Sequence, residues 1–594
     1  MAQASTKKIV FWIITVLFPF LLLALVEIGL RVGGYNKEAQ PLFVEAPNDS
    51  NFLISNSSFI SRYFPSFIPQ IAPNAFRKEK RPNTFRVFVF GGSSTQGFPY
   101  NFYYSFSEQL EQKLVLETDG LNIEVVNLGM TAVNSYVIRD LSKRILPYEP
   151  DAVVIYAGHN EYYGSFGVGT TQFGLVNNIG LKRLVIKLKN LRLYQLLENA
   201  MKPDNPDAGD NRTLMAKVVS ESNIELDSPL FDKGIQQFEK NIGDVLELYE
   251  RNDIPVYIGT VASNLKDQAP FTDQEDAASA FREAESLFAQ ADTMSAVNKY
   301  KEAKELDGIR FRAPDKINEV IRSVAEEHKA KLVDIEALLR AQSSSGIEDE
   351  SLFIDHLHPD YKGHRLMATL FFEHLLEVEK LKRAYRPNSF DLPDAISTFE
   401  ETYSNTAISR LLVGYPFQKG LTQDQELAEF QKIYQGYLQA SYIDSIAAHA
   451  ARNQRLVPEA LTEVINKAQS RNDTLAVITH YYELLKWQLN SVNLIEKGID
   501  IAVKSRIDDN YTVYMVNQVL NDGLQDPRYM DVLSAVYIMN QDLDKARYWL
   551  EKSEGRGSNA PMLFYNFARY HILTGDTLRA SEYYSKYVQA SQAN

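Results

Sequence analysis

A glycine-rich turn offers Ser93 as a nucleophile. Residues 91–97 read Gly-Gly-Ser-Ser-Thr-Gln-Gly and follow a short apolar run. The turn is not a phosphate-binding loop, because no Gly-Lys-Ser/Thr follows at the required spacing. It is not the Gly-x-Ser-x-Gly elbow either, because Thr95 occupies the second glycine position. Taken alone, the turn would predict a serine that caps the next helix, so the nucleophile interpretation depends on partners elsewhere.

Suitable partners follow other apolar runs. One run leads into Gly129 and another is followed by Asn160, and Asp355 and His358 stand three residues apart further on. A serine nucleophile needs a base, and that base needs a carboxylate to orient it, which His358 and Asp355 could supply. A glycine amide and an asparagine side-chain amide could donate hydrogen bonds to a developing oxyanion.

The elements that must position these residues alternate between strands and helices. Short apolar runs, separated by amphipathic stretches, occur at Val87–Phe90, Val125–Leu128, Ala152–Ala157, Pro255–Ile258 and Lys331–Ile335. Such runs with helical crossovers predict an α/β fold, a flavodoxin-like doubly wound parallel sheet. In that architecture ligands bind beyond the carboxyl ends of the strands. Four sequence blocks fall there: the turn with Ser93, the segments with Gly129 and with Asn160, and the segment with Asp355 and His358.

These four blocks, in this order, resemble the SGNH hydrolase superfamily, the GDSL-type esterases and lipases. The resemblance implies that Ser93 is the nucleophile, His358 the general base and then acid, and Asp355 the residue that orients His358. It also implies an oxyanion hole made by the Ser93 amide, the Gly129 amide and the Asn160 side chain. No cofactor and no metal are implied.

A closer resemblance spans almost the whole chain. An N-terminal apolar segment, residues 90–95 (Phe-Gly-Gly-Ser-Ser-Thr), residues 158–163 (Gly-His-Asn-Glu-Tyr-Tyr) and residues 306–312 (Leu-Asp-Gly-Ile-Arg-Phe-Arg) are similar to bacterial membrane-anchored SGNH hydrolase-type proteins with C-terminal tetratricopeptide repeats. Two positions depart from the superfamily pattern. Gly92 stands where Asp is usual, and Glu161 follows Asn160 where Asp is usual.

Composition narrows the classes of function. The chain has 594 residues, a formal net charge of −14 and no cysteine. An acidic chain without a long basic tract is a poor nucleic-acid binder. The lack of cysteine excludes disulfides, thiolate metal sites and cysteine nucleophiles.

The N-terminus predicts a membrane anchor. Lys7 and Lys8 precede the apolar run Ile9–Val26, and 18 residues at about 1.5 Å each nearly span a bilayer core. No convincing cleavage site follows, so an uncleaved signal anchor is favoured over a cleaved signal. The two lysines favour a cytoplasmic N-terminus and place the rest of the chain on the periplasmic or extracellular side.

We expect four parts along the chain. Residues 1–35 form the signal anchor, 36–82 a linker lying on the next domain, 83–385 the hydrolase-like domain, and 400–594 an all-α tetratricopeptide-like domain. A similar hairpin is expected as an insertion at 278–312. A period of 34 residues relates the last two helical units, and for example Ala546 aligns with Ala580. Such repeats would bind a protein partner. Residues 400–530 are helical but too irregular for units to be assigned.

A metal site is an alternative use of the histidine-rich segment. His356, His358 and His364, with Asp355 and Asp360, could ligate zinc. However, a metal on His358 would remove the best base for Ser93. We therefore expect His356 and His364 to lie at the surface or to support the residues of the site.

A basic amphipathic stretch occupies residues 181–197. It holds five basic and no acidic residues up to Leu197, with leucines at helical spacing at 181, 184, 188 and 191. The stretch could lie on a membrane surface or cover the active-site mouth. Alternatively, its leucines pack on the sheet domain and its basic face is solvated. The aromatic residues Tyr162, Tyr163 and Phe166 could form a sugar-stacking wall or ordinary core.

Three functions fit the sequence. The first is a membrane-anchored serine esterase that removes acyl groups, such as acetyl, from an envelope or extracellular carbohydrate or lipid. The second is an O-acyltransferase that uses the same triad. The third is a scaffold that binds a partner through its repeats, with an inactive hydrolase fold.

Overall fold

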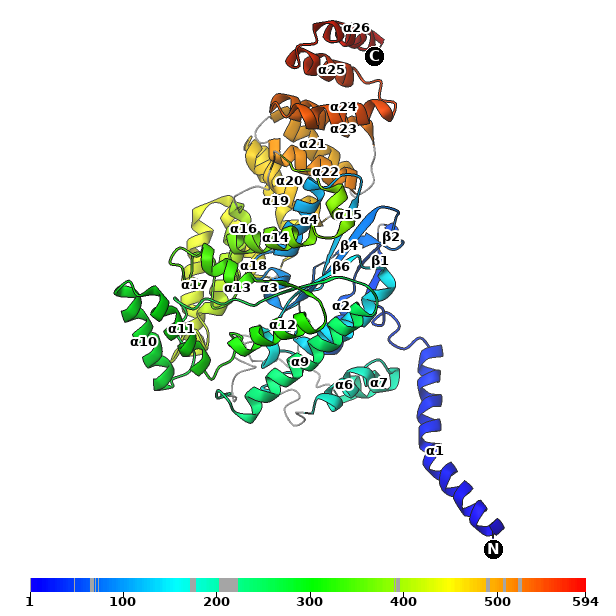
Figure 1. Cartoon of the computed structure of the whole chain (residues 1–594), viewed down its shortest axis with the longest axis vertical. Helices are drawn as coiled ribbons and strands as arrows, with labels where there is room; N and C mark the ends of the chain where they lie inside the picture. Colours follow the sequence, from blue (N-terminus) through cyan, green and yellow to red (C-terminus); the bar gives the residue numbers. More distant parts are fainter. Residues whose placement is uncertain are drawn as a thin grey trace.

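The computed structural model describes residues 2–47, 49–64, 69, 71–72, 74–170, 178–201, 223–388, 390, 396–453, 455–487, 492–505, 509–521 and 526–593. A long N-terminal helix, α1 (Ala2–Val32), projects from a central α/β domain. The helices of the C-terminal region stack away from that domain toward the opposite end of the molecule (Figure 1).

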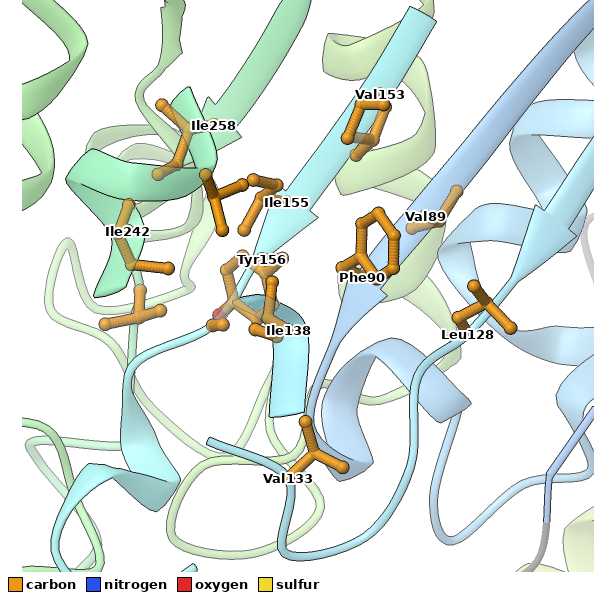
Figure 2. Close-up of a cluster of buried hydrophobic side chains, with 14 of the residues drawn as sticks. Val89, Phe90, Leu128, Val133, Ile138, Val153, Ile155, Tyr156, Ile242 and Ile258 are labelled. Atoms are coloured by element: carbon orange, nitrogen blue, oxygen red, sulfur yellow. The ribbon is translucent and has the colours of Figure 1, made fainter. Parts of the chain in front are cut away.

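Five parallel strands form the central sheet in the order β5-β4-β6-β7-β8. The strands are β4 (Thr84–Gly91), β5 (Asn122–Asn127), β6 (Ala152–Tyr156), β7 (Val256–Gly259) and β8 (Lys331–Val333). This order, 2-1-3-4-5 along the chain, is that of a flavodoxin-like doubly wound sheet, so the predicted fold class is confirmed. Every residue of β4 and β6 is buried, as expected for central strands covered on both faces (Figure 2).

Two layers of helices sandwich the sheet. Helix α4 (Phe106–Glu117) packs against α14 (Tyr361–Leu375). Helix α9 (Pro229–Glu250) packs against both α5 (Ser135–Ile145) and α12 (Asp315–Glu327) to form the other layer. Shorter helices α13 (Ile335–Gln342) and α15 (Glu379–Ala384) complete the domain.

The segment 36–82, expected to be a linker, contains a small sheet of its own. Strands β1 (Phe43–Ala46), β2 (Asp49–Ser55) and β3 (Phe76–Arg77) pair antiparallel. The Phe43 and Phe76 rings lie 4.8 Å apart, and both pack on Phe88 of β4. The segment does lie on the next domain, and five of its aromatic residues are part of that domain's core: Phe43, Phe59, Tyr63, Phe64 and Phe76. The frequent prolines suggested a linker, whereas the aromatic residues between them determine the structure.

The expected hairpin is inserted between β7 and β8. Helices α10 (Glu275–Ala289) and α11 (Thr293–Leu306) pack closely, because Ala284, Ala296 and Ala303 are buried and small. The turn lies where the sequence predicts it, since the Asp292 side chain caps α11 by accepting from the Ser295 N–H.

In the described residues from 398 onward, all the regular elements are helices. They are α16 (Thr398–Leu412), α17 (Gln423–Ala440), α18 (Tyr442–Arg452), α19 (Val457–Ser470), α20 (Thr474–Trp487), α21 (Val492–Ser505), α22 (Asp509–Asn521), α23 (Pro527–Met539), α24 (Leu543–Gly555), α25 (Pro561–Leu573) and α26 (Thr577–Ala593). The first helices of the last four pairs begin at Val457, Val492, Pro527 and Pro561, at intervals of 35, 35 and 34 residues. Regular pairs therefore extend into the stretch that the sequence left unassigned. Their assignment as tetratricopeptide repeats stays a prediction.

Helix α1 is long and apolar enough to cross a membrane. Its stretch Phe11–Val32 has a mean hydropathy of 2.5, and none of it is buried in the protein. Its 22 residues correspond to about 33 Å, slightly more than a bilayer core. A signal sequence near the N-terminus would have the same character.

Candidate active site

The carboxyl ends of neighbouring strands bring the predicted residues to one edge of the sheet. Strand β4 ends at Gly91, and Ser93 begins the short helix α3 (Ser93–Gln96). Gly129 follows β5, and Asn160 lies in the 3-10 helix η4 (His159–Glu161) just after β6. The segment with Asp355 and His358 precedes α14.

Ser93, His358 and Asp355 form a continuous hydrogen-bonded relay. The Ser93 Oγ lies 2.7 Å from His358 Nε2, and His358 Nδ1 lies 2.6 Å from Asp355 Oδ2. The other carboxylate oxygen, Asp355 Oδ1, accepts from the backbone N–H groups of Leu357 and His358 at 2.9 and 2.8 Å. These bonds fix the carboxylate, and the carboxylate in turn fixes the plane of the imidazole.

The electrostatics of the relay favour an ionised Asp355. Burial alone would raise the pKa of this carboxyl, but the neighbouring imidazoles of His358 and His356 and the hydrogen bond with His358 hold it well below its usual range. His356 Nδ1 lies 3.3 Å from Asp355 Oδ1, without the geometry of a hydrogen bond. Burial lowers the pKa of His356, so this second imidazole is neutral at pH 7. An anionic carboxylate can stabilise an imidazolium that forms at His358.

The Asn160 side chain lies against the nucleophile turn. A Cβ added to Gly92 would meet Asn160 Nδ2 at 2.5 Å, so the amide lies directly beside the residue that precedes Ser93. The Gly129 N–H has a different partner, because it donates to the Asn127 side-chain oxygen at 2.8 Å. The structure thus brings Asn160 to the turn that holds Ser93, while the Gly129 amide is already engaged.

The two departures from the superfamily pattern have structural roles. At position 92 a side chain would displace the Asn160 amide, so glycine leaves room for it. Glu161 does not face Ser93. Its carboxylate accepts from the N–H and hydroxyl groups of Ser135 at 3.1 and 2.8 Å, and burial raises its pKa to about 7. Glu161 therefore ties the segment that carries Asn160 to helix α5.

The metal alternative concerns Asp355, His356 and His358, whose possible ligand atoms lie within 4.8 Å of one another. However, the Asp355 oxygens and both His358 nitrogens already have hydrogen-bond partners within the relay. The other two candidate ligands have separate roles: Asp360 caps α14, and His364 is buried beside Phe106. A metal would have to break the relay in order to bind.

The structure adds aromatic neighbours that the sequence did not indicate. The Phe98 ring packs edge-on against the His358 ring at 4.8 Å. Phe271, Phe311 and Phe417 surround His356, with ring centres 5.2 to 5.9 Å from it. Phe417 comes from the connection between α16 and α17, so the helical region contributes to the surroundings of the relay. No local pattern could have predicted a contact between residues so distant along the chain.

The aromatic residues after Asn160 belong to the core. Tyr162, Tyr163 and Phe166 are all buried, and Tyr162 stacks on Phe231 of α9. Of the two roles considered for these residues, the structure supports ordinary core packing.

A doubly wound parallel sheet with a serine, a histidine and a carboxylate beyond its strand ends is an arrangement suited to acyl transfer through a serine nucleophile. Residues 89–366 match the sequence model of the GDSL-like Lipase/Acylhydrolase family. The sheet domain of this chain therefore belongs to that family, within the SGNH hydrolase superfamily, whose members are enzymes that act on ester bonds.

Solved structures of similar proteins cover about half of the chain. The acetyl xylan esterase AlAXEase has 14% identity and a TM-score of 0.27, covering 49% of this chain and 100% of its own. The acetylxylan esterase Axe2 from Geobacillus stearothermophilus has 14% identity and a TM-score of 0.27, covering 49% and 94%. A GDSL-like lipase from Bacteroides thetaiotaomicron VPI-5482 has 13% identity and a TM-score of 0.25, covering 49% and 88%. No curated protein matches the chain in a sequence comparison.

Proposed function

We propose that the protein is a membrane-anchored serine esterase that removes small acyl groups, such as acetyl, from an envelope or extracellular carbohydrate or lipid. The observation that carries this proposal is the relay itself. Ser93 Oγ lies 2.7 Å from His358 Nε2, and His358 Nδ1 lies 2.6 Å from Asp355 Oδ2. This is the geometry that general-base activation of a serine requires.

The reaction would proceed through an acyl-enzyme. Ser93 Oγ attacks the ester carbonyl while His358 Nε2 takes the serine proton, and Asp355 stabilises the resulting imidazolium. The Ser93 amide and the Asn160 side chain donate to the oxyanion. Gly129 would be a third donor if its N–H is shared with Asn127. His358 then protonates the departing alcohol, and a water activated by His358 releases the acid and restores Ser93.

Burial of the nucleophile supports a small acyl group. Ser93 is only 9% exposed, and the Phe98 ring lies against His358. A short acyl chain could reach Ser93 Oγ with little rearrangement, whereas a long one would have to displace packed aromatic side chains.

Anchoring of the enzyme by α1 favours a substrate that is located at the cell surface. An α1 helix in the membrane would hold the relay on the periplasmic or extracellular side, where polymer-bound esters occur. In this proposal the helical region binds a protein partner that brings enzyme and substrate together.

Fluorophosphonate labelling of the full chain tests the nucleophile. We expect rapid labelling, its loss in Ser93→Ala, and at least about a thousandfold loss of p-nitrophenyl acetate hydrolysis in that variant. Ser94→Ala is a matched control, since Ser94 is also buried but lies outside the relay. Labelling that persists in Ser93→Ala, or a folded wild-type chain that does not label, would contradict the proposal.

Product analysis then distinguishes transfer from hydrolysis. With acetyl esters in the presence of added oligosaccharides, an esterase releases acetate, whereas an O-acyltransferase acetylates the sugar. Rates should fall from acetyl to octanoyl esters. A preference for octanoyl esters would overturn the small-acyl assignment.

A further inference from the structure

The basic stretch lies in a helical hairpin. Several of its leucines face outward and most of its basic side chains face the protein, which is the reverse of the packing alternative considered from the sequence. Helices α6 (Ile179–Leu188) and α7 (Arg192–Met201) are joined by a short turn. The large apolar side chains on the outside, 37 to 75% exposed, are Leu181, Leu184, Leu191, Leu197 and Met201. Leu181 and Leu184 lie three residues apart on α6 and so share one face, and Leu191 lies in the turn between the two helices.

The basic side chains hold the hairpin on the protein. The Lys182 ammonium is buried and donates to the carbonyl oxygens of Phe166 and Gly167 at 2.7 and 3.3 Å. Arg183 donates to the Asn241 side chain of α9 at 2.8 and 3.0 Å. Of two further buried cations, Arg192 donates to the Asn36 carbonyl oxygen beyond α1, whereas Lys189 bonds the Glu198 carboxylate within the hairpin. Positive charge therefore anchors the hairpin, and apolar surface is presented outward.

Exposed apolar side chains are concentrated on this hairpin. Among the described residues between 36 and 390, the only other large apolar side chains with comparable exposure are Leu226 and Met294. An exposed apolar surface of this kind on an otherwise well-buried domain marks an interaction site.

The hairpin adjoins the end of α1. The Glu27 carboxylate of α1 accepts from the Leu193 N–H of α7 at 2.8 Å, and Asn36 donates to the Gln195 side chain at 2.8 Å. In Figure 1, α6 and α7 lie beside the end of α1 that joins the body, and the rest of α1 extends away from them. If α1 spans a bilayer, these contacts place the hairpin at the level where the apolar helix leaves the membrane.

We propose that the α6–α7 hairpin lies in the interfacial layer of the same membrane that α1 spans, with its leucines among the lipid acyl chains. This inference rests on the proposed anchoring by α1. Lipid is the occupant that fits because α7, which carries part of the exposed apolar surface, packs against α1, whose stretch Phe11–Val32 is itself apolar and exposed. A second contact besides the single helix would fix the tilt of the sheet domain and the direction in which its active site faces.

The binding should depend on apolar contact rather than charge. Among the five basic residues of the stretch, only Lys187 is exposed, and the other four bond the protein. Insertion should therefore be similar in neutral phosphatidylcholine vesicles and in vesicles that also contain phosphatidylglycerol.

Site-directed spin labelling tests the inference, because the chain contains no cysteine and each introduced cysteine is unique. Labels are placed in the full chain through Leu184→Cys and Leu197→Cys on the hairpin and Phe20→Cys within α1. Met294→Cys, exposed on the inserted hairpin, is the matched aqueous control. After reconstitution into vesicles of either composition, collision rates with oxygen and with a water-soluble nickel complex report the depth of each label.

We expect the labels at 184 and 197 to collide with the nickel complex several-fold less often than the label at 294, and with oxygen more often. Equal nickel access at 184, 197 and 294, with the label at 20 inside the bilayer, would overturn this inference alone. A label at 20 that stays in water would overturn the anchoring and this inference together. Dipolar coupling between labels on two chains, with both reagents excluded, would identify a second copy as the occupant and would also overturn it. If the labels at 184 and 197 are protected from the nickel complex only in vesicles that contain phosphatidylglycerol, the hairpin binds through charge, which would overturn the proposed apolar contact.

Discussion

At the scale of single residues, the site depends on how closely Asn160 approaches the turn that holds Ser93. The amide nitrogen lies 2.5 Å from the position that a Cβ of residue 92 would take. Because the clashing atom is the end of a side chain, the amide could move away without unfolding the surrounding structure. Position 92 should therefore affect activity more strongly than stability.

We expect Gly92→Ala to lower kcat for acetyl ester hydrolysis by about one hundredfold, the usual effect of losing one oxyanion donor. The melting temperature should change little. Gly436→Ala, at a helical position where an added Cβ meets nothing within 4 Å, is the matched glycine control and should have full activity. Steady-state kinetics and thermal unfolding of both variants check the expectation.

A double-mutant cycle shows whether the effect passes through Asn160. Asn160→Ala should lose about as much activity as Gly92→Ala, and the double variant should lose hardly more than either. Additive losses would mean that the added methyl group acts in some other way, for example by moving Ser93 itself.

At the scale of elements, the central sheet has an edge strand that the helical region covers. Strand β5 lies at the end of the sheet. The Asn521 side chain of α22 accepts from the Ile123 N–H at 2.6 Å and donates to the Ile123 carbonyl oxygen at 2.9 Å. These two bonds continue the ladder of the sheet and occupy an edge that could otherwise pair with another chain.

Asn521→Ala should lower the free energy of unfolding by about 2 kcal/mol, since it leaves two backbone groups of β5 without their partner. Asn517→Ala is the matched control on the same helix, because within the described part of the chain that amide bonds the Val513 carbonyl oxygen of its own helix and no residue of the sheet. Urea unfolding of the full chain in detergent compares the two variants. Equal destabilisation would show that Asn521 contributes only helical packing.

Local sequence patterns were sufficient to predict the strands and helices. They could not predict contacts between residues that are distant along the chain. The runs at Val87–Phe90 and Ala152–Ala157 are apolar enough to identify buried strands, and the residues after them identify the candidate site. Tertiary contacts decide the rest: Phe417 approaches His356 from another region, and Asn127 takes the Gly129 N–H. The direction of the hairpin leucines was also not predictable, because helical spacing defines a face but not what covers it.

At the scale of the whole molecule, hydrogen bonds connect the helical region to the segment that follows Ser93. The Asn101 backbone and side chain both donate to the buried Glu400 carboxylate of α16 at 2.5 Å. Tyr104 donates to Glu483 of α20, also at 2.5 Å. Two acidic groups thus lie buried at one junction between the regions. Burial, and then the charge of Glu483, raise the pKa of Glu400 to about 8.

This raised pKa makes the free energy of unfolding depend on pH. In the unfolded chain Glu400 releases its proton near pH 4.5, whereas in the folded chain it keeps the proton up to about pH 8. The native state therefore binds more protons between these values. The contribution of Glu400 to the free energy of unfolding is therefore fully present below about pH 4.5. It is lost as the pH rises toward 8, and the loss amounts to up to roughly 4 kcal/mol.

We expect Glu400→Gln to flatten this decline, because glutamine does not ionise, even though the substitution weakens one of the bonds to Asn101. Glu401→Gln, at the exposed neighbouring position, should keep the wild-type slope. Urea midpoints of the full chain in detergent at pH 5, 6.5 and 8 measure the three slopes. If the Glu400→Gln midpoint falls with pH as steeply as that of the wild type, the decline arises from other buried carboxyl groups such as Glu161. In that case the junction between the two regions would not be the part of the molecule that senses pH.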